Sequence, residues 1–140
     1  MGLDYDQGSD IVVDEMGYAY VVGFTFSADF PTTPGTFDTT FNGGNNDIFA
    51  VKLNPVGSDL IYGTFIGDEG TDWGFGIDLD DAGNAYVAGY TSSIHFPTTP
   101  DAFDPHFNGG HDCYPDPPGP GARALDLFHL SGAEAPEYGE

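Results

Sequence analysis

One stretch of the chain occurs twice. Residues Ile11–Asn46 have the sequence IVVDEMGYAYVVGFTFSADFPTTPGTFDTTFNGGNN, and residues Ile77–Asp112, 66 positions later, have the sequence IDLDDAGNAYVAGYTSSIHFPTTPDAFDPHFNGGHD. The two copies align without gaps, and 20 of the 36 aligned positions are identical. Self-similarity at a fixed period of this kind is typical of repeat architectures, in which each copy is one supersecondary unit. The 140 residues therefore hold two copies of one unit and little else.

Each copy has the pattern of a small antiparallel sheet. In the first copy, short β-branched or aromatic runs at Asp10–Asp14, Tyr18–Thr25, Asp47–Leu53 and Asp59–Ile66 are separated by turn residues. The second copy carries a stronger hairpin turn, DAGN, at Asp81–Asn84. No segment repeats its apolar residues with a helical period. The sequence predicts an all-β fold in which each unit is a four-stranded antiparallel β-meander.

The period and the strand composition together predict a β-propeller. The run Ala19–Val22 is apolar on both faces, and such a strand needs a layer on each side. Four-stranded sheets stacked around an axis supply these layers, whereas the alternative, a β-solenoid, usually has shorter coils. We expect about two blades of a partial propeller. Residues 1–74 form the first blade and residues 75–140 the second, which is degenerate after residue 112.

The charge of the chain excludes several classes of partner. Two basic residues face 23 acidic ones, and the formal net charge is −21. A nucleic-acid-binding protein needs a cationic surface, and anionic membranes are disfavoured for the same reason. Cations, cationic proteins and neutral glycans remain as partner classes. Because aromatic residues make up 15% of the chain, we expect it to fold.

The repeat resembles a known family. The run Ile77–Thr91, which contains GNAYV and GYT, and the FPTT segment Phe96–Thr99 resemble the SBBP family of bacterial and archaeal propeller repeats, named for seven-bladed propellers. Asp47–Asn54 (DIFAVKLN) and Tyr62–Gly67 (YGTFIG) resemble it too. The resemblance implies a repeat from a larger secreted or cell-surface protein. It carries no catalytic residues to this chain.

One segment departs from the repeat. Cys113–Gly121 (CYPDPPGPG) stands where the first copy has Asp47–Asn54. Proline cannot donate to a central ladder, so we expect the second blade to lack a proper third strand. A damaged repeat, a sequence error and a tolerated loop all remain open as explanations.

Two clusters have the residue types of metal ligands. The turn DLDDAGN places Asp78, Asp80, Asp81 and Asn84 in an order similar to calcium loops, but the first copy does not keep the pattern. We interpret it as a hairpin turn with solvated carboxylates and leave Ca²⁺ as an open alternative.

The second cluster consists of zinc-ligand types, but its spacing fits no closed zinc site, and we interpret it as adventitious. Its members are His106, His111, Asp112, Cys113 and Asp116. We therefore assign no metal ligand, cofactor site or catalytic residue from the sequence.

The long connection Phe30–Asn46 contains Phe30, Phe37 and Phe41 and recurs as Phe96–Asp112. Loops of this length are uncommon unless they are functional or are packed by their own side chains. The aromatic side chains either pack back onto the blade, the interpretation that we favour, or form a binding face for glycan or protein.

Two repeats are too few to close a ring, since such units bury their faces only against neighbours. We expect a fragment of a longer propeller, and assembly of several chains is the alternative. Its partners would be further blades of the parent chain or other copies, with no nucleic acid and no membrane insertion.

The function that we predict is a non-enzymatic binding module, for protein or glycan, or an architectural scaffold. The alternative is the propeller part of a secreted carbohydrate-active or calcium-dependent enzyme with its catalytic residues elsewhere. The chain has no nucleophile elbow, phosphate-binding loop or HExxH motif. No signal peptide is visible at the start of this chain, so the extracellular or cell-surface location rests on the resemblance alone.

Overall fold

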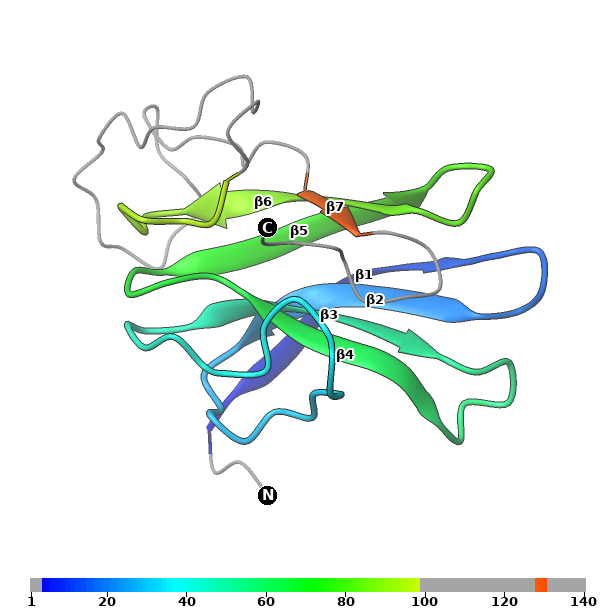
Figure 1. The fold of residues 1–140 in the computed structure, drawn as a ribbon, viewed down its shortest axis with the longest axis horizontal. Coiled ribbons are helices and arrows are strands. Elements are labelled where there is room, and N and C mark those ends of the chain that lie inside the picture. The colour runs from blue at the N-terminus through cyan, green and yellow to red at the C-terminus, as the bar shows by residue number, and fades with distance from the viewer. Residues whose placement is uncertain (1–3, 99–127, 131–140) are drawn as a thin grey trace.

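The computed structural model describes residues 4–98 and 128–130, and the part of the chain that it describes contains strands and no helix (Figure 1). The predicted all-β fold is confirmed. None of the described residues form a helix that could cross a membrane. The seven strands are β1 (Asp6–Val13), β2 (Ala19–Thr25), β3 (Asp47–Leu53), β4 (Leu60–Ile66), β5 (Asp72–Leu79), β6 (Ala85–Thr91) and β7 (Phe128–Leu130).

The first sheet is an antiparallel meander in the order β1-β2-β3-β4, as predicted. Its first strand begins at Asp6, four residues before the predicted start at Asp10. The strand extends to Asp6 because Asp6 pairs with Thr25 on β2. An irregularity between Gly8 and Asp10 then shifts the register of the pairing between β1 and β2. A bulge of this kind is hard to predict from alternation of side chains alone.

The second sheet has the order β5-β6-β7. Its first strand begins at Asp72, opposite Thr91, so the expected boundary between residues 74 and 75 falls inside β5. β7 pairs with β6 in the place that β3 occupies beside β2. In the repeat alignment, however, residues 128–130 correspond to part of β4. The proline-rich segment 113–121, where we expect the loss of a third strand, lies outside the described residues.

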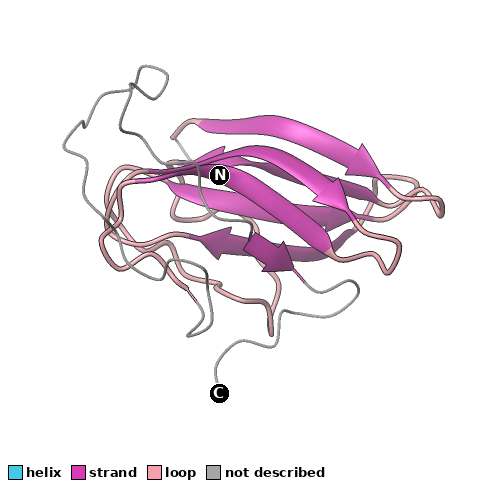
Figure 2. Cartoon of the chain, turned by 90° about the horizontal axis from the view of Figure 1, so that it is seen from above, coloured by secondary structure: helices cyan, strands magenta, loops and turns pink. Residues whose placement is uncertain are grey.

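The two sheets pack face to face, as Figure 2 shows from above. A single hydrophobic cluster joins them, and its buried members are Tyr20, Val22, Ile48, Ala50, Tyr62 and Ile66 from the first sheet and Ile77, Ala85 and Val87 from the second. Contact is close at Gly74, where an added Cβ would lie 2.7 Å from Cγ2 of Val22. The sheets are therefore stacked as neighbouring blades of a partial propeller.

The connection between β2 and β3 covers the opposite face of the first sheet along β3 and β4. Phe30 stacks on Phe49 with ring centroids 4.3 Å apart, and Phe41 meets the ring of Phe65 at 5.9 Å. The carbonyl of Asp38 accepts a hydrogen bond of 2.8 Å from the amide of Phe65 on β4. The prediction that these aromatic side chains pack back onto the blade is confirmed in the first copy. The loop also covers the edge of β4, which would otherwise be open to strand pairing.

Candidate functional site

The two blades are joined by a polar junction at one end of the sheets. Residues 45–47, which lead into β3, meet residues 67–73, which form the connection after β4 and the first two positions of β5. We call these two segments together the blade clasp. Asn45 donates its amide to the carbonyl of Gly70 (3.2 Å), and Asp72 donates its amide to the carbonyl of Asn46 (3.1 Å). Backbone hydrogen bonds therefore cross directly from one blade to the next.

Asn46 is the central side chain of the blade clasp. It is fully buried, its Oδ1 accepts a hydrogen bond of 3.1 Å from Nε1 of Trp73, and its amide donates to the carbonyl of Asp72. Trp73 in turn stacks on Phe24 of the first sheet, with centroids 4.9 Å apart and planes within 12°. A buried amide with both ends bonded fixes the two blades in one register.

Asp72 lies at the start of β5 and ties the second blade together. Its carboxylate accepts hydrogen bonds from the amide of Asp68 (3.1 Å), the hydroxyl of Ser93 (2.8 Å) and the hydroxyl of Thr91. The side chain is fully buried. Burial raises the pKa of Asp72 to about 6, although the hydrogen bonds from Thr91, Asp68 and Ser93 act to lower it.

Asp47 is the second buried carboxylate of the blade clasp. Its Oδ2 accepts a hydrogen bond of 2.8 Å from the amide of Asn42. Burial raises the pKa of Asp47 to about 7, and the negative charges of Asp72, Asp38 and Asp68 act in the same direction. The junction therefore concentrates acidic groups where solvent does not reach.

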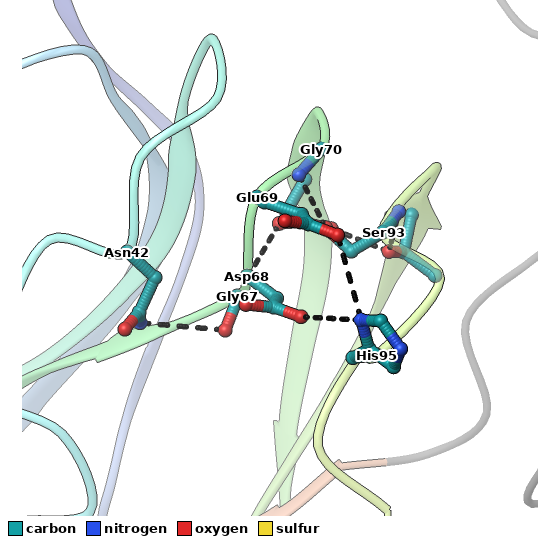
Figure 3. A network of polar contacts seen from close by, with 9 residues as sticks. Asn42, Gly67, Asp68, Glu69, Gly70, Ser93 and His95 are labelled. Carbon is teal, nitrogen blue, oxygen red and sulfur yellow. Dashed lines mark hydrogen bonds and ion pairs between the residues drawn. The ribbon is translucent and has the colours of Figure 1, made fainter.

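A more exposed polar network covers this junction (Figure 3). The amide of Asn42 donates to Asp38 (2.6 Å) and, at 3.4 Å, to the carbonyl of Gly67. Nδ1 of His95 lies 3.8 Å from Oδ2 of Asp68 and 3.4 Å from Oε1 of Glu69. Asp68, Glu69 and His95 offer one ligand atom each within 4.8 Å of one another, so they have the geometry of a surface metal site.

The acidic turn with the residue types of a calcium loop joins β5 and β6 as a hairpin turn. Oδ1 of Asp80 accepts hydrogen bonds from the amides of Ala82 and Asn84, and Oδ2 accepts from the side chains of Asn84 and Tyr86. The hydrogen bonds from Asn84 lower the pKa of Asp80. Gly83, at φ 82°, closes the turn in the left-handed region. Both carboxylate oxygens are thus used by the turn, as the hairpin interpretation predicts.

The histidine and cysteine cluster of the second copy, from His106 to Asp116, lies outside the described residues. In the first copy its aligned positions include the clasp residues 45–47. Similarity between the two copies does not reveal the blade clasp, because residues 45–47 are where the copies differ. The signal that was available is the change from Asn45-Asn46-Asp47 to His111-Asp112-Cys113 directly after a conserved FNGG.

An open groove of about 550 Å³ lies beside the blade clasp. It is lined by the starts of β1 and β5 and the end of β2, with Tyr5, Gln7, Gly8, Ser9, Phe24, Phe26, Trp73 and Phe75. Tyr5 and Phe75 are exposed aromatic side chains. The groove has an aromatic floor and no charged side chain among its lining residues.

Comparison with known proteins identifies the repeat. Residues 61–97 match the family model of SBBP, described as a beta-propeller repeat. This segment is therefore similar to an SBBP propeller repeat. The match begins on β4, crosses the blade clasp and continues past β6, so the matched segment spans the junction between the two sheets. No curated protein and no solved structure matches the chain.

Proposed function

We propose that this SBBP-repeat chain is a non-enzymatic scaffold module of a secreted or cell-surface protein, and that its sheets stack on further blades of the same kind. The support for stacking is a reciprocal pattern of burial at aligned positions of the two repeats. The extracellular location in this proposal rests only on the resemblance of the repeat to the SBBP family.

On each of the two faces of the repeat, aligned positions of the two blades differ in burial. Val22 of the first blade is fully buried against the second blade, whereas the aligned Ala88 is exposed. Conversely, Ile77 of the second blade is only 8% exposed, whereas the aligned Ile11 is 58% exposed. Each blade buries the face that meets its neighbour and exposes the face that has none among the described residues.

The two exposed faces are therefore the two halves of one interface. The face around Ala88 corresponds to the covered face of the first blade, and the face around Ile11 corresponds to the covered face of the second. Such a head-to-tail relation is heterologous, and repetition of it closes a ring when the rotation allows. A further SBBP-type blade, in the same parent chain or in a second copy, fits both faces.

Analytical ultracentrifugation tests this proposal with a second copy as the probe. We expect concentration-dependent association of the chain, which either Ile11→Glu or Ala88→Glu abolishes, since each introduces a charge into one half of the interface. Val56→Glu, at a position that is 82% exposed in the β3–β4 turn, is the control and leaves association unchanged.

A mixture of the two interface variants makes the test sharper. Each variant keeps the half that the other has lost, so an equimolar mixture of Ile11→Glu and Ala88→Glu forms a one-to-one dimer and nothing larger. A chain that stays monomeric at every concentration, or variants that associate like the parent, would contradict the proposal.

The aromatic groove supports a binding role for a neutral glycan beside the scaffold role. Exposed aromatic faces stack on sugar rings, and a pocket with an apolar lining and a few polar groups is the usual form of a ligand site. The strongly negative chain disfavours acidic sugars. On an array of neutral glycans we expect binding that Tyr5→Ala or Phe75→Ala removes. Ile94→Ala, which truncates an exposed apolar side chain outside the groove, keeps it. Equal signals from all four proteins would exclude this groove.

A further inference from the structure

The two buried carboxylates of the blade clasp converge on one point. A Cβ added to Gly67 would lie 2.7 Å from Oδ1 of Asp47 and 2.7 Å from Oδ2 of Asp72. Asp47 comes from the first residue of β3 and Asp72 from the first residue of β5, so the two belong to different blades. Both carboxylate oxygens therefore approach the same point beside Gly67, which has no side chain there.

One of these oxygens has no partner. Asp72 accepts hydrogen bonds at both oxygens, from the hydroxyl of Ser93 and from the amide of Asp68 among others. Asp47 accepts one at Oδ2, but its Oδ1 is buried without any hydrogen-bond partner, and the residue is 0% exposed. An unsatisfied buried carboxylate oxygen is costly, so a native structure that keeps one needs a compensating group.

No basic side chain of the described residues supplies this compensation. Lys52 lies on the same strand as Asp47 but at its opposite end, where Nζ sits over the rings of Tyr18 (4.6 Å) and Tyr20 (4.9 Å). The charged groups that act on Asp47 are the carboxylates of Asp72, Asp38 and Asp68. Asp47 therefore has acidic neighbours and one oxygen that is available to a cation.

We propose that Asp47 and Asp72 bind a hard divalent cation of the Ca²⁺ class through their converging oxygens beside Gly67, as a bridge between the two blades. Carboxylate oxygens without sulfur or imidazole are the ligand set that Ca²⁺ and Mg²⁺ prefer. Ca²⁺ tolerates irregular oxygen geometry better than Mg²⁺ does, which favours it at a site assembled from two separate strands. The more exposed carboxylate of Asp68 adds negative charge at the rim.

This site differs from the two other acidic groups that have the residue types of metal ligands. Asp80 uses both of its oxygens in the hairpin turn. The group of Asp68, Glu69 and His95 is more open, with the His95 side chain 75% exposed, and its imidazole suits a transition metal. The inference does not depend on further blades, because both ligands lie within this chain.

The experiment compares calcium with an equal ionic strength of KCl, because any salt screens a chain of net charge −21. The whole chain, treated with EDTA, is titrated with CaCl₂ while its melting temperature and the heat of binding are measured. We expect one site per chain and a rise in melting temperature beyond that produced by KCl. Equal shifts with CaCl₂ and KCl, or no saturable heat, would overturn the proposal.

Variants locate the ion. Asp47→Asn keeps the size of the side chain and removes the charge, so we expect it to weaken Ca²⁺ binding by about tenfold or more. Without calcium, it melts no lower than the parent, because a buried charge is lost. Asp81→Asn, which removes the same charge at an exposed position, is the matched control and keeps the calcium response. Equal losses in both variants would mean non-specific screening and would contradict the site.

Two further measurements keep the result independent of the fold of one variant. Gly67→Ala leaves the charge of the chain unchanged but places a methyl group 2.7 Å from Oδ1 of Asp47 and 2.7 Å from Oδ2 of Asp72. We expect it to abolish the rise in melting temperature that is specific to calcium. Tb³⁺, a probe for Ca²⁺ sites, should show luminescence excited through Trp73, which adjoins Asp72 and is the single tryptophan of the chain. Loss of this signal in His95→Ala, rather than in Asp47→Asn, would place the ion in the surface group and contradict the proposal.

Discussion

The two blades place the same residue types in different environments. Asp72 begins β5, is fully buried and accepts the hydroxyl of Ser93. The aligned Asp6 begins β1 and is exposed, and the aligned Ser27 keeps a buried hydroxyl without a hydrogen-bond partner. The difference is that a preceding blade covers Asp72, whereas no described residue covers Asp6 in that way. In this fold, the burial of a residue therefore depends on whether a neighbouring blade covers it, and not on its position within the repeat alone.

The largest expected effect comes from a charge placed in the face that the second blade covers. Val22→Asp introduces an unpaired charge at a fully buried position, and we expect a loss of about 3 kcal/mol or more in the free energy of unfolding. The aligned Ala88→Asp is expected to change the free energy by at most about 0.5 kcal/mol, because Ala88 is exposed. Urea denaturation of the two variants measures the difference. Similar losses would mean that the aligned faces are equivalent.

A smaller effect is expected from the glycines at the blade contact. A Cβ on Gly74 would lie 2.7 Å from Val22 and 2.9 Å from Ile48, whereas the nearest atom to a Cβ on the aligned Gly8 is 3.6 Å away. Gly74→Ala should therefore destabilise the chain by about 1–3 kcal/mol through overpacking. Gly8→Ala should be close to neutral. Thermal denaturation of both variants measures the difference in stability. Equal melting temperatures would mean that the contact at Gly74 is less tight than the structure shows.

The blade clasp itself can be weakened by a single truncation. Asn46→Ala removes the hydrogen-bond partner of Trp73 and leaves a buried indole N–H unsatisfied, so we expect a loss of about 1–3 kcal/mol. Asn45→Ala removes an exposed hydrogen bond to Thr71 and should cost less. Denaturation followed by Trp73 fluorescence measures both. A smaller loss for Asn46→Ala than for Asn45→Ala would contradict the role of Asn46 as the central contact.

The smallest effect concerns the two hairpin turns, whose fourth residue differs. Asn84 holds the pKa of Asp80 below its ordinary value. A lowered pKa means that the ionised carboxylate stabilises the turn at neutral pH, and that this contribution is lost as the pH falls through the lowered pKa. Asn84→Tyr, which copies Tyr18 of the first turn, should raise the pKa of Asp80 and move this loss to higher pH.

An NMR titration of the Asp80 carboxyl carbon measures this change. Asn54→Ala, in the β3–β4 turn, is the control and should leave the pKa of Asp80 unaltered. An unchanged titration in Asn84→Tyr would show that Asn84 is not the cause of the low value.

Much of the fold could be predicted because its signals are local. β3 matches its predicted bounds, and the turn at Asp80 forms the predicted hairpin. The start of β1 at Asp6 was missed, because an edge strand with a bulge does not alternate regularly. The site could not be found in the same way. Asp47 and Asp72 are 25 positions apart and ordinary in composition, and they form a pair only because β3 and β5 begin at the same end of two stacked sheets.

The sequence by itself determined the repeat, the four-stranded meander, the hairpin turns and the excess of negative charge. These follow from residue periodicity, turn chemistry and composition, which act between neighbours along the chain. The tertiary structure decided which copy of each face is buried, which of two aligned aspartates is enclosed, and where an oxygen of Asp47 is left without a partner. These properties depend on what packs against a residue, and similar repeats meet different neighbours in a stack that is open at both ends of the described chain.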